Sequence, residues 1–186
     1  MFDPEKTKVV QLTKSYRSTK QITDFTKHIL IGGEAIEAFE REGNKPHVYQ
    51  AKNEQEGVAT VINILGKYQK DHDAVAIIGK DLKDSEELYQ KLNANNIKAT
   101  LIRTENQRLV KGPIVVPSYL AKGLEFDVVI VYNANDKNYG ESSIDMKLLY
   151  VAMTRAMHSL CIDYDGKLPS YLKKLTQTEK VLRKTK

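Results

Sequence analysis

The chain has 186 residues, of which 41% are hydrophobic and 28% charged, and this composition suits one compact domain with a hydrophobic core. It contains no apolar run long enough to cross a bilayer and no apolar signal-peptide segment at its start, so we expect a cytoplasmic protein with no membrane partner. The single cysteine, Cys161, excludes a disulfide framework, and we expect it to be a buried strand residue. The four histidines lack metal-ligand spacing, so no metal site is predicted in this chain.

The net charge of +5 is unevenly distributed along the chain. Residues 167–186 contain seven basic residues and one acidic residue, whereas the other 166 residues contain 22 basic and 23 acidic ones. We therefore predict a main domain over residues 1–166 and a basic C-terminal helix or tail over residues 167–186. Because the main domain carries almost no net charge, charge alone argues only weakly for a nucleic-acid partner.

The first half of the sequence alternates between strand-like and helix-like patterns. The predicted elements are a strand at 9–12, a helix at 18–30 with Ser18 as its N-cap, a short helix at 34–41, a strand at 47–50 and an amphipathic helix at 53–70.

The second half continues the alternation and contains the clearest strand, the apolar run at 74–79. The other predicted elements are a helix at 85–95, strands at 97–102, 114–116 and 128–131, a helix at 145–156, a strand at 160–162 and a terminal helix at 170–184. Such alternation predicts an α/β fold with a parallel sheet and helices on both faces. Ligands of such sheets bind beyond the carboxyl ends of the strands, so we expect functional residues in those loops.

The first candidate motif is Ser-Tyr-Arg-Ser-Thr at 15–19, between a strand and a helix. The guanidinium of Arg17 could bind a phosphate, and Tyr16 could stack on a base. The alternative from local physics is a surface turn in which Ser18 caps the helix.

The second motif, at 117–127, lies between two buried strands. Gly123 permits close backbone approach, Lys122 supplies a positive charge, and Glu125 could accept hydrogen bonds from a sugar hydroxyl. The alternative is a plain turn with a solvated carboxylate.

The third motif, Leu-Leu-Tyr-Val-Ala-Met-Thr-Arg-Ala at 148–156, reads as an apolar helix with Arg155 near its C-terminal end. The residues three and four positions earlier are apolar, so the guanidinium has no intrahelical carboxylate. The alternative is an arginine that stabilises the negative end of the helix dipole.

Taken together and in this order, the three motifs resemble the C-terminal motifs of superfamily 1 DNA helicases of the UvrD/Rep type. The sequence of residues 117–123, Pro-Ser-Tyr-Leu-Ala-Lys-Gly, resembles that of the helicase IV or HelD branch. The resemblance extends from Leu12 to Ile162 and implies a RecA-like fold, the second motor domain of a P-loop NTPase-like pair. This chain contains no Walker A sequence. The Mg²⁺ ligands and the rest of the ATP site are therefore expected on the N-terminal RecA-like domain of the same parent, and this domain alone should be inactive.

The resemblance also implies roles for individual residues. Tyr16 would stack on adenine, Arg17 would contact the γ-phosphate, and Arg155 would be the arginine finger, which makes the two arginines the catalytic residues. Gly123 and Glu125 would approach the phosphates and the ribose. We expect Arg17, Glu125 and Arg155 to line one exposed edge of the sheet.

DNA contacts are expected at Ser118, Tyr119 and Lys122, in a segment where this chain departs from the family pattern at two positions. Tyr119 could stack on a base, and the alternative is that its ring packs against the edge of the sheet. The family usually has Thr and His at the positions of Pro117 and Tyr119. The leading hypothesis is an ATP-dependent helicase or translocase on DNA, either single-stranded or at a duplex junction. The alternatives are a motor that remodels a protein complex such as RNA polymerase, and a degenerate domain that serves only as a binding module.

Overall fold

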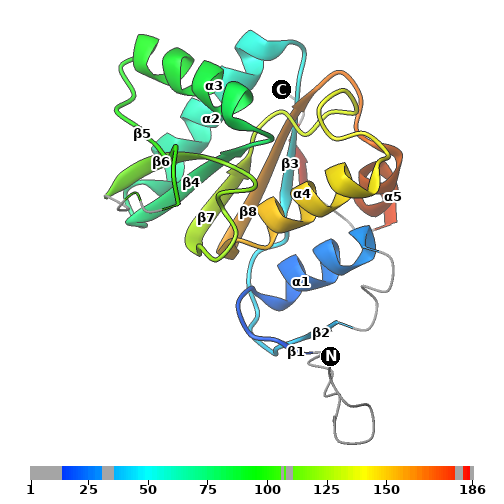
Figure 1. The fold of residues 1–186 in the computed structure, drawn as a ribbon. Helices are drawn as coiled ribbons and strands as arrows, with labels where there is room; N and C mark the ends of the chain where they lie inside the picture. The colour runs from blue at the N-terminus through cyan, green and yellow to red at the C-terminus, as the bar shows by residue number, and fades with distance from the viewer. Residues whose placement is uncertain (1–13, 31–35, 106, 108–110, 179–181, 185–186) are drawn as a thin grey trace, which may run out of the picture.

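The computed structural model describes residues 14–30, 36–105, 107, 111–178 and 182–184. At its centre lies a seven-stranded sheet in the order β5-β6-β4-β7-β8-β3-β9, and all neighbouring strands pair in parallel (Figure 1). The strands are β3 (His47–Ala51), β4 (Ala74–Gly79), β5 (Thr100–Leu101), β6 (Gly112–Pro117), β7 (Phe126–Val131), β8 (Ala156–Asp165) and β9 (Leu182–Lys184). The predicted α/β fold with a parallel sheet is confirmed, and the arrangement is RecA-like.

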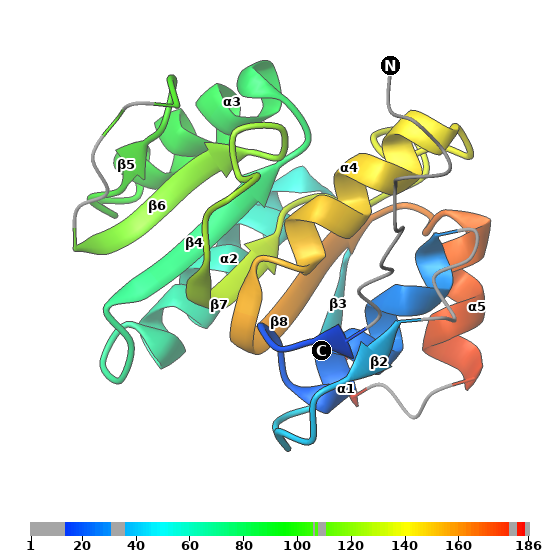
Figure 2. The ribbon, with the colours of Figure 1, turned by 60° about the horizontal axis from the view of Figure 1, so that its bottom comes forward.

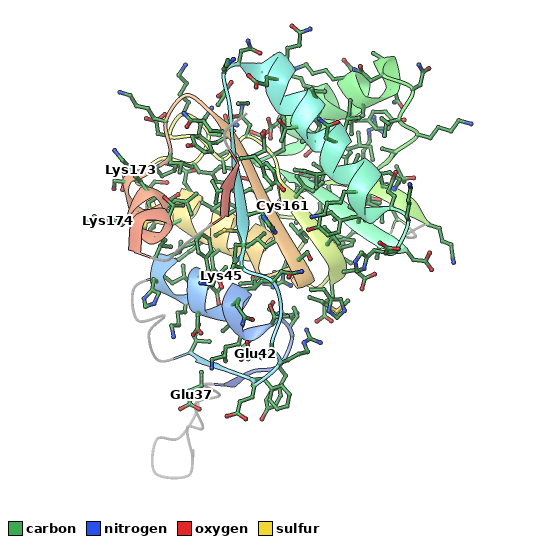
Figure 3. The ribbon with its side chains drawn as sticks, turned by 180° about the vertical axis from the view of Figure 1, so that it is seen from behind. Glu37, Glu42, Lys45, Cys161, Lys173 and Lys174 are labelled. Atoms are coloured by element: carbon green, nitrogen blue, oxygen red, sulfur yellow. The ribbon has the colours of Figure 1, made fainter. Side chains whose placement is uncertain are left out.

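Helices cover both faces of the sheet, as predicted (Figure 1). The helices α2 (Glu54–Tyr68) and α3 (Leu82–Ala94) pack on one face. The other face is covered by α1 (Lys20–Thr26), α4 (Ser143–Met153) and α5 (Ser170–Thr178). The apolar runs of the central strands are buried between these layers because they have helices on both sides. Cys161 lies in β8 and is fully buried, which confirms its prediction (Figure 3).

A small two-stranded sheet lies beside α1, apart from the central sheet (Figure 2). It consists of β1 (Lys14–Ser15) and β2 (Glu37–Ala38), which pair in parallel. The predicted helix at 34–41 is therefore wrong over the described residues 36–41, because pairing with β1 overrides the weak helical preference of this segment. The predicted strand at 9–12 lies outside the described residues.

The start of α1 differs from the prediction. Thr19, not Ser18, occupies the N-cap position, and the helix runs to Thr26 before a short 3₁₀ turn, η1 (Lys27–Ile29). The hydroxyl of Ser18 instead donates a hydrogen bond to the carbonyl of Ala156, 2.6 Å away. A contact with the start of β8 thus takes the place of the expected cap.

The C-terminal part of the chain contains two further corrections. Helix α4 ends at Met153, so Arg155 lies in the turn before β8 and not in the helix as predicted. The terminal helix ends at Thr178, and Leu182–Lys184 forms β9 at the edge of the sheet instead of continuing the helix. The basic tail therefore contributes one strand to the sheet, and the division at residue 167 stays a prediction.

Candidate nucleotide-binding site

The three motifs meet at the amino ends of β7 and β8. Glu125 immediately precedes β7, and Arg155 immediately precedes β8. The two segments are joined by a hydrogen bond of 3.0 Å from the amide of Phe126 to the carbonyl of Arg155. Our expectation of a site at the carboxyl ends of the strands is wrong for these residues. The loop at 118–125 runs from the carboxyl end of β6 to the amino end of β7. Because the strands are parallel, the loop begins at one end of the strands and finishes at the other.

Arg17 and Glu125 form an ion pair between the first two motifs. The Nε atom of Arg17 lies 2.5 Å from Oε1 of Glu125, and both side chains are about half exposed, at 36% and 45%. A pair this exposed is well solvated, so it contributes little to stability and can exchange for another anion.

Arg155 is 8% exposed, so the expectation that it would lie open at the edge is wrong. Its guanidinium turns back onto the end of α4, where Nε donates to the carbonyl of Val151 at 3.0 Å. Nη1 donates to the carbonyl of Leu124 at 3.3 Å, and Nη2 donates to the hydroxyl of Thr154 at 3.2 Å. Among the described residues it has no carboxylate within ion-pair distance.

Arg155 lies in an environment that disfavours its positive charge. Burial holds the pKa of Arg155 below its usual value, and the positive charge of Arg17 lowers it further, although Glu125 acts in the opposite direction. Arginine still stays protonated at neutral pH. Two guanidinium groups thus lie close enough to interact, and Glu125 is paired with one of them, so an added anion would be stabilised there.

A cavity of about 190 Å³ adjoins both arginines. Arg17, Arg155 and Lys27 line it together with serine and threonine residues, and no acidic residue from the described part of the chain lines it. Thr23 also lines the cavity; the residue is 5% exposed, and its buried hydroxyl has no hydrogen-bond partner among the described residues. The hydroxyls of Ser18, Thr26 and Thr154 already donate to backbone carbonyls. The guanidinium groups are therefore the part of this lining that matches the chemistry of a phosphate group.

Tyr16 lies beside Arg17 and is 64% exposed. Its ring packs against that of Phe39, with ring centroids 5.1 Å apart and the planes tilted by 39°. An exposed aromatic ring next to a guanidinium is an arrangement on which a nucleoside base could stack. Phe39 was missed by the sequence analysis because its segment was interpreted as a helix.

Gly123 has a φ of +87°, a conformation that favours glycine. A Cβ atom placed there would meet nothing within 4 Å, so backbone conformation and not space explains this glycine. The next residue, Leu124, offers its carbonyl to Arg155. The observed role of Gly123 is therefore to shape the loop around Arg155, and its approach to phosphates stays a prediction.

The three residues expected to contact DNA differ in accessibility. Ser118 is fully buried, and its hydroxyl donates to the carbonyl of Lys80 at 2.5 Å, so it is not offered to a ligand. Tyr119 is 48% exposed, and Lys122 is exposed. Ser118 and Tyr119 follow the carboxyl end of β6, whereas Arg155 precedes the amino end of β8, so they lie at opposite ends of the parallel strands.

The described residues contain neither a candidate metal cluster nor a helix suited to span a membrane. No group of three or more His, Cys, Asp or Glu side chains in this part of the chain could hold a metal ion. None of the described helices combines the length and the apolar character that a membrane span requires.

Known proteins share both the sequence and the fold. Two family models, each described as a UvrD-like helicase C-terminal domain, match residues 10–108 and 114–162. A search of curated proteins returns no match. The structure of the C-terminal domain of a possible DNA helicase from Lactobacillus plantarum WCFS1 is 46% identical to this chain, with a TM-score of 0.77. The match covers 88% of this chain and 96% of that one.

More distant structures share the fold alone. The C-terminal domain of the DEAD-box protein Dbp5 is 13% identical, with a TM-score of 0.52, over 75% of this chain and 87% of that chain. The structure of S. cerevisiae Dbp5 bound to RNA and ADP BeF3 is 14% identical, with a TM-score of 0.54, over 79% and 44% of the two chains. One family model spans more than half of this sequence and the bacterial relative matches nearly all of it, so the chain belongs to the UvrD-like helicase C-terminal domain family.

Proposed function

We propose that this domain is the C-terminal half of an ATP-dependent DNA helicase or translocase and that it supplies Arg17 and Arg155 to the ATP site. The observation that carries the proposal is the meeting of both arginines at one cationic cavity, although they come from distant parts of the chain. The partner in this site is the N-terminal RecA-like domain of the same parent. The relative that is 46% identical is described as part of a possible DNA helicase, which supports DNA as the track.

Arg155 is suited to act as the arginine finger despite its burial. A guanidinium has five N–H groups, and three of them donate to Val151, Leu124 and Thr154. Two N–H groups are left for the transferred phosphoryl group. The three existing bonds fix the orientation of the guanidinium in advance, which is what stabilisation of a developing charge requires.

Arg17 would bind ATP by exchanging one anion for another. In this structure its guanidinium binds Glu125, and a γ-phosphate would take over that role when the two motor domains close on ATP. Glu125, once released, would be able to accept a hydrogen bond from the ribose. Mg²⁺ neutralises phosphate charge in such sites, and we assign its ligands to the N-terminal domain.

We assign the parent protein to the helicase IV or HelD branch because the sequence of residues 117–123 resembles that branch. The candidates for contact with the DNA strand are the exposed Tyr119, which follows the carboxyl end of β6, and the exposed Lys122, further along the same loop. Because the nucleotide and the DNA would bind at separate places on the domain, closure of the two motor domains on ATP could move this domain along the DNA strand.

The test is the ATPase activity of the full-length parent carrying Arg17→Ala or Arg155→Ala. We expect turnover to fall by about 10³-fold, as for an arginine finger, while nucleotide binding is largely kept. Arg103→Ala is the matched control, because Arg103 forms a similar exposed ion pair, 3.0 Å from Glu86. Normal turnover in both site variants would refute the assignment.

A further inference from the structure

The segment at residues 37–41, which we call the strap, lies directly against the Tyr16–Arg17 motif. Strand β2 within the strap pairs with β1, so that Glu37 lies opposite Lys14 and Ala38 opposite Ser15. The amide of Phe39 then donates to the carbonyl of Ser15 at 3.0 Å. Figure 2 shows the two short strands side by side, and Figure 3 shows Glu37 and Glu42 near the ends of the strap, below α1.

Phe39 and Tyr16 are in ring contact, because their centroids are only 5.1 Å apart. At a tilt of 39° the rings pack partly face to face, so Phe39 restricts the directions in which Tyr16 can point. Tyr16 nevertheless keeps 64% of its surface exposed, enough for a base to stack on it.

Arg41 connects the other end of the strap to the backbone of Arg17. Its Nη2 atom donates both to the carbonyl of Arg17 and to the carbonyl of Met157, the latter at 3.0 Å. The carbonyl of Arg41 accepts a hydrogen bond of 2.8 Å from the amide of Lys20, at the first turn of α1. One side chain thus fixes the backbone of Arg17 relative to β8, the strand that Arg155 precedes.

We infer that the strap is a positioning element of the nucleotide site, in which Phe39 orients Tyr16 for the base and Arg41 orients Arg17 for the phosphate. The inference rests on the function proposed above and adds residues outside the three motifs. It separates two effects: Phe39 acts on recognition of the base, and Arg41 acts on the charge that stabilises the reaction.

The experiment compares Phe39→Ala and Arg41→Ala in the full-length parent. Besides ATP turnover, it measures inhibition by ADP, which carries a base, and by inorganic tripolyphosphate, which does not. For Phe39→Ala we expect the KM for ATP and the Ki of ADP to rise about fivefold, with kcat and the Ki of tripolyphosphate unchanged. For Arg41→Ala we expect kcat to fall at least about tenfold, because a small misplacement of a catalytic group is costly.

The controls use neighbouring and conservative variants. Glu40 is an exposed neighbour in the strap, so Glu40→Ala should leave kcat, the KM for ATP and both Ki values unchanged. Phe39→Tyr should restore the Ki of ADP, whereas Phe39→Leu, which keeps an apolar contact without the ring, should not, and Phe39→Leu carries the test if the alanine variant does not fold.

Equal rises in both Ki values for Phe39→Ala would overturn the inference, since they would indicate general docking of the partner domain and not orientation for the base. An unchanged kcat for Arg41→Ala would also overturn it. Both results remain distinguishable from failure of the proposed function, which would appear as normal turnover in Arg17→Ala and Arg155→Ala.

Discussion

The Nε atom of Arg17 lies 2.5 Å from Oε1 of Glu125, although 108 residues separate the two in the chain. The pair brings the first and second motifs into direct contact and neutralises one of the two guanidinium charges. In the proposed site, phosphate binding to Arg17 would compete with Glu125, and the affinity for an anion would depend on the strength of the Arg17–Glu125 pair.

Removing the charge of Glu125 should make Arg17 a better anion site. For Glu125→Gln in the full-length parent, we expect the Ki of tripolyphosphate to fall by up to about fivefold, because exposed ion pairs contribute about 0.2–1 kcal/mol. Glu86→Gln, which removes the partner of Arg103, should leave the Ki unchanged. A weaker affinity in Glu125→Gln would mean that the carboxylate orients Arg17 and does not compete for it.

Arg155 should contribute to stability as well as to turnover. Arg155→Ala removes hydrogen bonds to the carbonyls of Val151 and Leu124 at a nearly buried position, so we expect a loss of about 1–3 kcal/mol in the free energy of unfolding. Arg17→Ala should cost less than about 1 kcal/mol, since its ion pair is solvated. Urea denaturation of the domain measures both values, and equal losses would contradict the difference in burial.

The sequence predicted the elements that depend on local patterns. The apolar run of β4 and the amphipathic helix α2 appear close to their expected bounds, because a buried strand and a one-sided helix leave periodic signals. The three motifs were found from their residue types, and Arg17 and Glu125 indeed lie together.

The errors concern contacts between distant segments. Strand β2 pairs with β1, and β9 pairs with β3; neither pairing leaves a mark in the local sequence. The prediction of Ser18 as the helix cap failed for the same reason, because its hydroxyl donates to the carbonyl of the distant Ala156. Burial of Arg155 could not be predicted either, since it depends on where α4 ends and on the path of the loop at 118–125.

Tyr119 should contribute to DNA binding by stacking. For Tyr119→Ala in the full-length parent, we expect the Kd for single-stranded oligothymidine to rise about tenfold, and Tyr119→Phe should keep the affinity. Ile144→Ala is a control for an exposed apolar side chain that cannot stack, since Ile144 is 68% exposed at the start of α4. Fluorescence anisotropy measures the Kd of each variant, and an equal loss of affinity in Tyr119→Ala and Ile144→Ala would argue against stacking.

Asp163 should make the stability of the domain fall as the pH rises from about 4 to about 7. The residue is 1% exposed, one of its carboxylate oxygens has no partner among the described residues, and burial raises its pKa to about 7. The negative charges of Asp165 and Glu56 also raise the pKa, whereas a hydrogen bond from the backbone of Asn133 lowers it.

Between the unfolded and folded pKa values the folded state binds the extra proton, so its advantage is complete at low pH and is lost as the pH passes 7. The full effect is on the order of 4 kcal/mol at 1.36 kcal/mol per pH unit. Asp163→Asn keeps a carbonyl for the Asn133 amide but cannot ionise, so it should raise the melting temperature at pH 8 more than at pH 5. Asp136→Asn, at an exposed carboxylate, is the matched control. Parallel pH profiles for wild type and Asp163→Asn would contradict the prediction, because they would show that Asp163 has the same pKa in the folded and unfolded states.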